Sequence, residues 1–373
     1  MNHEGIRHIR VVGTGLIGAS VGLALSRAGA QVTLDDPSPT AAALARDLGA
    51  GRLPAPDDPL PDLVVVAAPP DVVATVIVHA LRQWPHAVVT DVASVKATVL
   101  QTAASLLRAQ DADPGTLSRY VGGHPMAGRE RSGAVAARED LFEGRPWVVC
   151  AHPGADPDAV DAVVWLAGRA GGSVIHMTAE DHDAAVAAVS HTPQLAASLV
   201  AARLRDLSSE AVALSGQGVR DVTRIAESDP ALWTQILAGN ARPVADVVTA
   251  LRDDLNTVLD ALNALAADPE EAPGARAALA RAVANGQSGR ARIPGKHGAA
   301  PARYGVVTVV VPDTPGTIGR LLTEVGDAGV NLEDLRIEHG VGRPVGTVEL
   351  IVLPAAVEPL ARELTALGWS VHV

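Results

Sequence analysis

The chain has 373 residues and a formal net charge of −12, with 48% hydrophobic and 2% aromatic residues. This length suits two or three domains, and their cores must be built mainly from Ala, Val, Leu and Ile. The negative charge argues against a nucleic-acid partner, because general nucleic-acid binders show a basic footprint. A single cysteine, Cys150, excludes an intrachain disulfide and a Cys-based zinc site, so the chemistry is compatible with a reducing cytosol.

The first five residues run almost directly into an expected strand. They lack the basic region and apolar stretch of a signal peptide. No apolar run reaches the length needed to span a membrane. We therefore expect a cytoplasmic protein with no membrane partner.

Strands and helices alternate through the first half of the chain. Short apolar strands are expected at 9–12, 31–34, 63–68, 87–90, 120–122, 147–150 and 174–177. The run LVVVAA at 63–68 is typical of a strand that is buried on both faces. This alternation predicts an α/β domain over residues 1–178 with a doubly wound, parallel, Rossmann-like sheet.

Helical periodicity replaces the strand pattern in the second half. It predicts an all-α domain over 179–270, which we expect to form a homodimer because its apolar surface exceeds what one sheet edge can cover. Residues 271–303 are rich in Pro, Gly, Ala and Arg and are expected to be a linker with one helix near 276–284. The pattern at 304–373 is strand, helix, strand, strand, helix, strand, which predicts a ferredoxin-like α+β unit.

A glycine-rich motif follows the first strand and opens a helix. This is the context that a dinucleotide-binding fingerprint requires, although a Gly-rich turn in another kind of α/β domain remains the alternative. The backbone N–H groups at the start of the helix would face a pyrophosphate. The residues expected at the cofactor are Gly13, Gly15, Leu16, Ile17 and Gly18.

Two acidic residues end the second strand, at Asp35 and Asp36. Strand alternation puts residue 36 on the same face as Val32 and Leu34, so we favour Asp36 as the acceptor for the ribose 2′-hydroxyl. A carboxylate there repels a 2′-phosphate, which favours NAD over NADP. Pro69 and Asp71 follow the 63–68 strand and are also expected at the cofactor, although a simple strand terminator would look similar.

The segment Thr90-Asp-Val-Ala-Ser94-Val-Lys96 lies at another strand end. Ser94 could donate to a substrate or nicotinamide oxygen; alternatively, Asp91 and Ser94 only cap the next helix. Lys96 is one of two lysines in an arginine-rich chain, which hints at a role. Lys296 in the linker shows how weak that hint is.

His124 stands in the segment Gly122-Gly-His124-Pro-Met-Ala-Gly128-Arg-Glu130. The glycines and proline predict a tight turn that presents the ring to a cleft, where an imidazole can receive a proton from an alcohol. We expect it to titrate near the free value of about 6.5, shifted by its neighbours. A structural histidine is the alternative. Glu130 is expected to orient His124 or bind substrate, or else to be a surface acid.

These segments, taken in order, resemble the prephenate dehydrogenases, with the patterns G-x-G-L-I-G, D-x-x-S-V-K and G-G-H-P-x-A-G-x-E. The resemblance continues through Ser190-His-Thr-Pro193 and 221–233 and covers residues 8–265. It implies an NAD-dependent oxidation and decarboxylation of prephenate to 4-hydroxyphenylpyruvate, in tyrosine biosynthesis, with no metal. Arogenate or dual-substrate activity is the close alternative, and a catalytically silent NAD-dependent sensor is a more distant one.

The resemblance also implies roles for single residues. His124 accepts the proton of the ring hydroxyl, and Ser94 positions that hydroxyl and the nicotinamide. Arg224 binds a substrate carboxylate, unless it is a helix arginine paired with Asp221. The other residues expected on the substrate side are His191, Gln194, Glu130 and Lys96.

His191 matches a family motif at a helix break, although a buried helix histidine would also fit. The family often has a further histidine where this chain has Gln194, which leaves the choice between prephenate and arogenate open. No motif surrounds His152, His176 or His182, and we interpret these three as structural or surface groups.

Residues 304–373 resemble an ACT domain, on the segments Asp313-Thr-Pro-Gly316 and Gly329-Val-Asn331. Gly316 opens a helix whose free N–H groups can take an amino-acid carboxylate, and Asn331 can bind the amino group. On a tyrosine-pathway enzyme the expected effector is L-tyrosine, bound through Asp313, Gly316 and Asn331. A module that only dimerises is the alternative.

Overall fold

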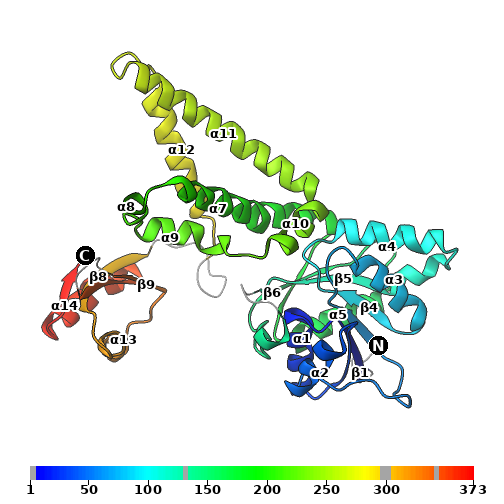
Figure 1. The fold of residues 1–373 in the computed structure, drawn as a ribbon. Helices are drawn as coiled ribbons and strands as arrows, with labels where there is room; N and C mark the ends of the chain where they lie inside the picture. The colour runs from blue at the N-terminus through cyan, green and yellow to red at the C-terminus, as the bar shows by residue number, and fades with distance from the viewer. Residues whose placement is uncertain (1–5, 129–132, 295–303, 340–343) are drawn as a thin grey trace. The chain divides into compact units, whose positions relative to one another are not determined.

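The computed structural model describes residues 6–128, 133–294, 304–339 and 344–373 (Figure 1). The chain divides into two compact units, Met1–Leu251 and Arg252–Val373.

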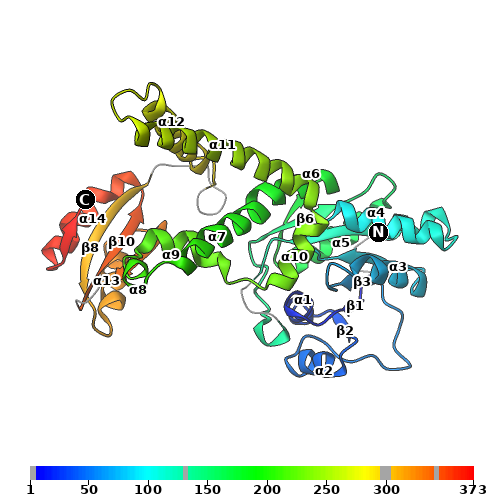
Figure 2. The ribbon, with the colours of Figure 1, turned by 45° about the horizontal axis from the view of Figure 1, so that its top comes forward.

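A seven-stranded sheet forms the centre of the first unit, in the order β2-β1-β3-β4-β5-β6-β7. Figure 2 labels its strands β1, β2, β3 and β6. Its first five strands are all parallel. The strands are β1 (His8–Val12), β2 (Gln31–Asp35), β3 (Leu63–Val66), β4 (Val88–Asp91), β5 (Tyr120–Pro125), β6 (Pro146–Cys150) and β7 (Ser173–His176).

The prediction of a wholly parallel sheet is wrong for its last two strands. β6 pairs with β5 antiparallel, and β7 pairs parallel with β6. A parallel return needs a crossover, usually a helix. The described part of the connection from β5 to β6 contains only a short 3-10 turn, Ala134–Ala136, so the chain folds back beside β5 instead.

Helices cover both faces of the sheet. On one face pack α1 (Leu16–Arg27), α2 (Pro39–Asp47) and α5 (Pro157–Arg169), and on the other α3 (Val73–Gln83) and α4 (Ala97–Ala109). Strand β3 shows how this double cover determines the sequence of a central strand. Leu63 and Val65 belong to one core and Val64 and Val66 to the other, and all four are fully buried. A continuous apolar run is what such a doubly covered strand requires.

A chain of helices follows the sheet. Its members are α6 (Ala179–Val186), a π turn (Ala187–His191), α7 (Thr192–Arg203), a 3-10 turn (Leu204–Asp206), α8 (Ser209–Val212), α9 (Gln217–Thr223), a second 3-10 turn (Arg224–Ala226), α10 (Pro230–Gly239) and α11 (Ala241–Ala267). The predicted change from strands to helices after residue 178 is confirmed.

The run Ala179–Asp206 forms 28 residues of continuous helix, and an 18-residue stretch of it has a mean hydropathy of 1.2, which is long and apolar enough to cross a membrane by length and composition alone. The sequence analysis expected no segment long enough to span a membrane, because polar residues interrupt the apolar residues of this run. Two of them, His182 and Asp183, are buried and bond to other elements of the same unit. Such contacts are typical of a core helix rather than a membrane span.

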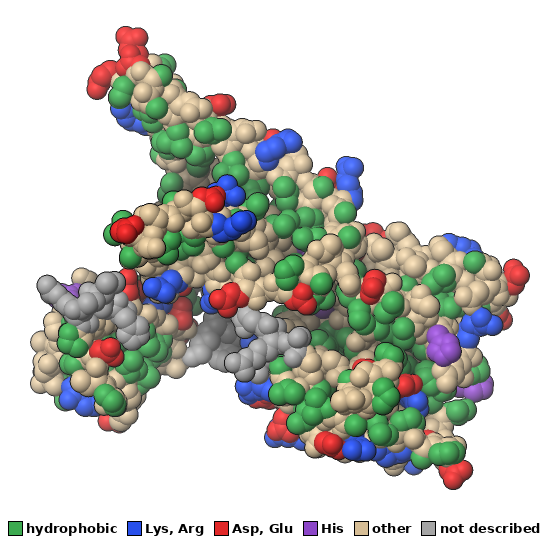
Figure 3. Space-filling model, in the orientation of Figure 1, with side chains coloured by type: hydrophobic (Ala, Val, Ile, Leu, Met, Phe, Trp, Pro, Cys, Tyr) green, Lys and Arg blue, Asp and Glu red, His purple; other side chains and the backbone are tan. Residues whose placement is uncertain are grey.

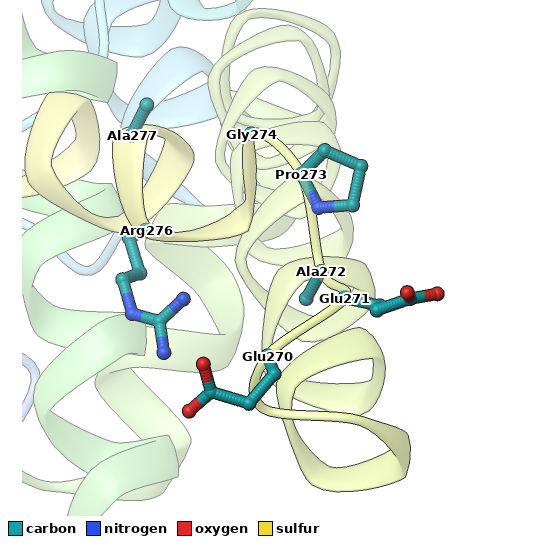
Figure 4. Close-up of a pocket in the computed structure, with 7 residues that line it drawn as sticks. All are labelled: Glu270, Glu271, Ala272, Pro273, Gly274, Arg276 and Ala277. Atoms are coloured by element: carbon teal, nitrogen blue, oxygen red, sulfur yellow. The ribbon is translucent and has the colours of Figure 1, made fainter.

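The second unit begins with a helical hairpin. Helix α12 (Ala275–Arg290) packs on α11 through Ala261, Ala272 and Ala275. The helix expected near 276–284 is therefore present and longer. The turn between the two helices encloses a surface hollow lined by Glu270, Glu271, Ala272, Pro273, Gly274, Arg276 and Ala277 (Figure 4). It contains none of the predicted site residues.

The rest of the second unit is a four-stranded antiparallel sheet in the order β11-β8-β10-β9. Two helices contribute Leu321, Val325, Leu360 and Leu364 to its core. The elements are β8 (Gly305–Pro312), α13 (Thr317–Asp327), β9 (Asp334–His339), β10 (Val345–Val352), α14 (Pro354–Ala366) and β11 (Ser370–His372). The predicted βαββαβ order is confirmed.

Candidate active site

The glycine-rich loop joins β1 to α1 and has the shape that a dinucleotide needs. Gly13 has φ +98°, and a Cβ there would lie 2.4 Å from the carbonyl oxygen of Ala67. A Cβ on Gly18 would lie 1.9 Å from the carbonyl oxygen of Gly13, whereas a Cβ on Gly15 would meet nothing within 4 Å. The loop is thus closed toward β3 and open at Gly15, where the first N–H groups of α1 begin, and this fits a pyrophosphate.

The two acids at the end of β2, Asp35 within the strand and Asp36 directly after it, have different partners. Asp36 Oδ2 accepts hydrogen bonds from Thr14 N at 2.7 Å and from Thr14 Oγ1 at 2.9 Å, so its carboxylate lies against the glycine-rich loop. Asp35 instead pairs with Arg10 at 3.1 Å. This geometry fits the prediction that Asp36, and not Asp35, would hold the ribose.

The other expected cofactor residues lie at the same edge. Leu16 and Ile17 form the half-buried first turn of α1. Pro69 and Asp71 are exposed beyond β3, and the carbonyl oxygen of Pro69 accepts the N–H of Val73 at the start of α3. The carboxyl ends of parallel strands are the ligand-binding edge of such sheets.

A buried ion pair joins the ends of β4 and β5. Lys96 is 1% exposed, and its Nζ donates to Asp91 Oδ1 and to the carbonyl oxygen of Gly123, the latter at 2.7 Å. Asp91 Oδ2 accepts from the hydroxyl of Tyr120 at 2.7 Å. The Lys96 ammonium is therefore engaged within the protein rather than open to a substrate, and it holds the backbone next to His124.

His124 itself lies in β5 and is 9% exposed. Its Nδ1 lies 2.8 Å from Nε2 of His182, and Nδ1 of His182 lies 2.8 Å from Asp183 Oδ1. Burial, and then the neighbouring His182, Lys96 and His191, hold the pKa of His124 well below its usual 6.5. At neutral pH the ring is a neutral imidazole that can accept a proton.

Helix α4 is capped from another helix. Neither Asp91 nor Ser94 caps it; the Asp183 carboxylate does, accepting from Lys96 N at 2.8 Å and from Ala97 N at 2.9 Å. Ser94 is half-buried, and its hydroxyl makes no hydrogen bond to the residues that the structure describes. The capping alternative for Ser94 is therefore wrong, and the hydroxyl remains available to a ligand.

His191 ends the π turn and is 1% exposed. Its Nδ1 lies 3.1 Å from Asn240 Nδ2. Its ring packs edge-on against the Trp233 ring, with 6.0 Å between the two ring centroids. Burial lowers the pKa of His191, and Asp183 partly opposes that shift. His182 also lowers it, so the three histidines lie within electrostatic reach of one another.

The remaining predicted substrate residues are less closely gathered. Gln194 is 6% exposed, and its Oε1 accepts from Ser228 Oγ at 3.3 Å. Arg224 is exposed at the start of its 3-10 turn, between α9 and α10. Glu130 lies outside the described residues.

The predicted effector residues belong to the second unit. Gly316 has φ +88° and precedes the first turn of α13. Asp313 and Asn331 are exposed, Asp313 after β8 and Asn331 before β9, and the Asp313 N–H donates to the carbonyl oxygen of Pro344 at 2.9 Å. Among the described residues, no hydrogen bond or ion pair joins these three to one another.

Two residues of the site, His182 and Asp183, were missed by the sequence analysis. The interpretation of His182 as a structural or surface group overlooked its bond to His124. The sequence carried little signal, because Glu180 and Asp181 directly precede the pair, so that it looks like part of an exposed acidic first turn of the helix. His152 does behave as a structural group, with Nε2 3.1 Å from the carbonyl oxygen of Leu117.

Known proteins are similar to this chain in both sequence and fold. Family models match the prephenate dehydrogenase nucleotide-binding domain at residues 21–176 and its dimerization domain at 178–271. A Streptomyces niveus protein named "Probable prephenate dehydrogenase NovF" is 36% identical over 365 residues, covering 97% of this chain and 98% of that protein.

Two solved structures are similar over about three quarters of the chain. Prephenate dehydrogenase from Aquifex aeolicus, in complex with hydroxyphenyl propionate and NAD⁺, has a TM-score of 0.64 and 26% identity over 77% of this chain and 98% of its own. Arogenate dehydrogenase from Synechocystis has a TM-score of 0.60 and 25% identity over 76% and 99%. The chain belongs to the prephenate dehydrogenase family and is an NAD-dependent dehydrogenase.

Proposed function

We propose that the chain oxidises and decarboxylates prephenate, giving 4-hydroxyphenylpyruvate for tyrosine biosynthesis. The observation that carries the proposal is His124, a buried imidazole with a lowered pKa at the carboxyl end of β5. The glycine-rich loop ends β1 at the same edge of the sheet, because the two strands run parallel. A base and a cofactor cradle at one edge suit the oxidation of an alcohol.

His124 begins the reaction by accepting the proton of the ring hydroxyl. Its Nδ1 is engaged by His182, so Nε2 is the nitrogen that takes this proton. NAD⁺, when bound, supplies the acceptor for the hydride that leaves the hydroxyl-bearing carbon. The bond to the ring carboxylate then breaks, carbon dioxide departs, and its electron pair aromatises the ring. The phenolate oxygen recovers the proton from His124, which restores the neutral imidazole.

The cofactor-binding roles follow from the geometry of the glycine-rich loop and of the strand ends beside it. We assign the pyrophosphate to the loop from Gly13 to Gly18 and the ribose to Asp36, with Pro69 and Asp71 at the rim. Ser94 would orient the hydroxyl and the nicotinamide, since its own hydroxyl is unengaged among the described residues.

On the substrate side, a guanidinium fork suits a carboxylate, so Arg224 is assigned to one of the two carboxylates of prephenate. His191 and Gln194 are assigned to the substrate side chain, and Glu130 to substrate or to His124. Lys96 supports the site through Gly123 and does not bind substrate itself.

Arogenate is the second candidate substrate, and Gln194 is the observation that favours keeping it. A buried amide that accepts from Ser228 carries no charge and can act as donor or acceptor, so it does not by itself distinguish a keto group from an amino group. Both substrates would use the same base and cofactor site.

The test is NAD⁺ reduction followed at 340 nm with prephenate and arogenate side by side. We expect prephenate to be the better substrate, with carbon dioxide and 4-hydroxyphenylpyruvate as products. A higher kcat/KM with arogenate would replace the substrate assignment. No turnover of either would leave an NAD-binding sensor as the better account.

We also propose that residues 304–373 form an ACT domain that binds L-tyrosine through Asp313, Gly316 and Asn331. The βαββαβ order and the left-handed Gly316 at the start of α13 support this proposal. Tyrosine should lower activity through a coupling of about 1–3 kcal/mol. Calorimetry on the full chain tests it, since Asn331→Ala should weaken tyrosine binding and leave uninhibited activity unchanged; no heat of binding with the wild type would refute it.

Finally, we propose a homodimer in the cytoplasm. Helix α11 exposes an apolar stripe at three- and four-residue spacing, and the space-filling view shows hydrophobic side chains over the helical region (Figure 3). The stripe consists of Val248, Leu251, Leu255, Leu259 and Leu262. Exposed apolar patches of this kind mark interaction surfaces.

A further inference from the structure

A row of buried side chains continues from His124 into helix α6. His124 Nδ1 bonds to Nε2 of His182, and Nδ1 of His182 bonds to Asp183 Oδ1, both at 2.8 Å. His182 is fully buried and Asp183 is 3% exposed. Each of these hydrogen bonds needs one donor and one acceptor, and this requirement places the protons.

The carboxylate of Asp183 only accepts hydrogen bonds, so Nδ1 of His182 must carry a proton. A neutral His182 then offers only a lone pair at Nε2. The bond to His124 therefore requires a proton on Nδ1 of His124, which leaves Nε2 of His124 as its free acceptor. The row determines the tautomer of the base before any substrate arrives.

We propose that His182 and Asp183 are positioning residues for His124: they hold its Nδ1–H and keep Nε2 available to the substrate hydroxyl, and the Asp183 carboxylate offsets the charge of the imidazolium that forms when the proton arrives. This inference rests on the proposed role of His124 as the base. A histidine oriented by a buried carboxylate is a recurrent arrangement in catalysis, and here a second imidazole stands between the two groups.

The anchoring of Asp183 supports an orienting role. Its carboxylate also accepts from Lys96 N and Ala97 N, and its carbonyl oxygen accepts from Asn240 Nδ2 at 2.8 Å. Three hydrogen bonds from outside α6 therefore fix this residue, two from the N-terminus of α4 and one from Asn240 at the end of α10. A group fixed in this way can hold the next ring in one orientation.

The buried charges around the row match the one proton that His124 receives in the reaction. The buried cluster holds one ammonium, on Lys96, and two carboxylates, on Asp91 and Asp183, so a single imidazolium makes it neutral. The remaining ionisable neighbours add no buried charge: Tyr120 and Cys150 have raised pKa values and stay protonated, His191 has a lowered pKa, and Glu180 is exposed.

Two substitutions of His182 separate orientation from folding. His182→Leu removes the acceptor for Nδ1–H of His124. His182→Gln keeps a carbonyl oxygen near the position of Nε2 but cannot be protonated. His176→Leu, at an exposed position at the end of β7, is the matched control and should behave as wild type.

For His182→Leu we expect kcat to fall roughly 10- to 100-fold with NAD⁺ affinity unchanged. Removing a residue that hydrogen-bonds and orients a functional imidazole typically costs about that much. His182→Gln should recover most of this loss. Its acidic limb should lie at higher pH than in wild type, because His182 lowers the pKa of His124. An equal loss in both variants, or a parallel loss of NAD⁺ affinity and melting temperature, would make His182 only structural.

Nitrogen-15 NMR of the full wild-type chain gives a reading that needs no substrate and no variant. We expect the Nδ1–H tautomer on both His124 and His182. An Nε2–H tautomer on His124 would overturn the inference even if the enzyme is active. If the expected tautomers are found but neither prephenate nor arogenate is turned over, the proposed function fails and the orientation of His124 stands.

Discussion

His124 must meet two opposing requirements. Its ring has to be unprotonated before the reaction, and it has to accept a proton during the reaction. Burial and the neighbouring positive or protonatable groups keep it neutral, while Asp183 lies two hydrogen bonds away. The free ring is therefore a weaker base than ordinary histidine. Its function depends on orientation and on the fate of the charge, which the surrounding side chains control.

The pH dependence of kcat/KM follows from this environment. The neutral ring is the active form, and its pKa is lowered, so activity should persist below pH 6.5 and decline only as pH falls through the lowered value. This replaces the sequence-based expectation of a value near 6.5. A pH profile of the wild type checks it. An acidic limb at or above 6.5 would show that the ring is less buried in solution, or that another group controls the limb.

Cofactor choice depends on which acid contacts the glycine-rich loop. Asp36→Ala removes the carboxylate that bonds to Thr14, and we expect NAD⁺ affinity to fall about tenfold or more, as for a lost hydrogen bond to a charged group. Relative use of NADP⁺ should rise. Asp35→Ala is the matched control, because Asp35 pairs with Arg10 instead. A cofactor ratio that changes only in Asp35→Ala would show that the wrong acid was assigned.

At the scale of elements, a π turn brings the histidines of two helices to one side. Buried residues recur at 182, 186 and 191, and the five-residue interval coincides with the turn Ala187–His191. π turns often mark functional sites. A π turn contains one residue more than an α-helical turn, which changes the direction in which the following side chains point. With this turn in place, His182 contacts His124 and His191 contacts Asn240.

Asp183 links these helices to the sheet, and its removal should cost stability as well as activity. Asp183→Ala deletes the cap of α4 and leaves the buried Nδ1–H of His182 without an acceptor. We expect the free energy of unfolding to fall by about 2–4 kcal/mol, the sum of a lost cap and an unpaired buried donor. Asp156→Ala, at the exposed cap of α5, should cost only about 0.5–2 kcal/mol. Equal losses in urea titrations would contradict this.

Some elements were predictable because local chemistry demands them. Gly13 needs its positive φ and Gly18 its missing side chain, so the motif predicted both the turn and the ligand it suits. The direction of β6 was not predictable, because alternation and hydrophobicity are the same for either direction. His182 was missed for a related reason: a polar pair on a helix looks solvated until its partner on β5 is known.

At the scale of the whole molecule, sequence motifs determined the family and the cofactor, while distant packing determined the surroundings of the base. The proton positions at His124 depend on residues from α6 and α4 that are far apart in the chain. Such long-range contacts leave little periodic signal in one sequence. The resemblance supplied the roles of His124 and Ser94, but the geometry added His182 and Asp183.

The apolar stripe on α11 makes the oligomeric state testable. Leu255 is 58% exposed, and Leu255→Asp places a charge in the middle of the stripe. We expect sedimentation of the wild type as a dimer and a shift toward the monomer in this variant. Asn256→Asp, the neighbouring exposed position, should leave the dimer intact. A monomeric wild type would contradict the proposed interface.

The central claim is that His124 is the base of an NAD-dependent prephenate oxidation. Steady-state kinetics of His124→Asn with prephenate test it most directly, because Asn retains a polar side chain but cannot accept the proton. We predict that kcat falls by roughly 10²–10⁴-fold, the usual contribution of general-base catalysis, that NAD⁺ affinity is nearly unchanged, and that the acidic limb disappears. A variant that keeps near-wild-type kcat with the same acidic limb would contradict the account.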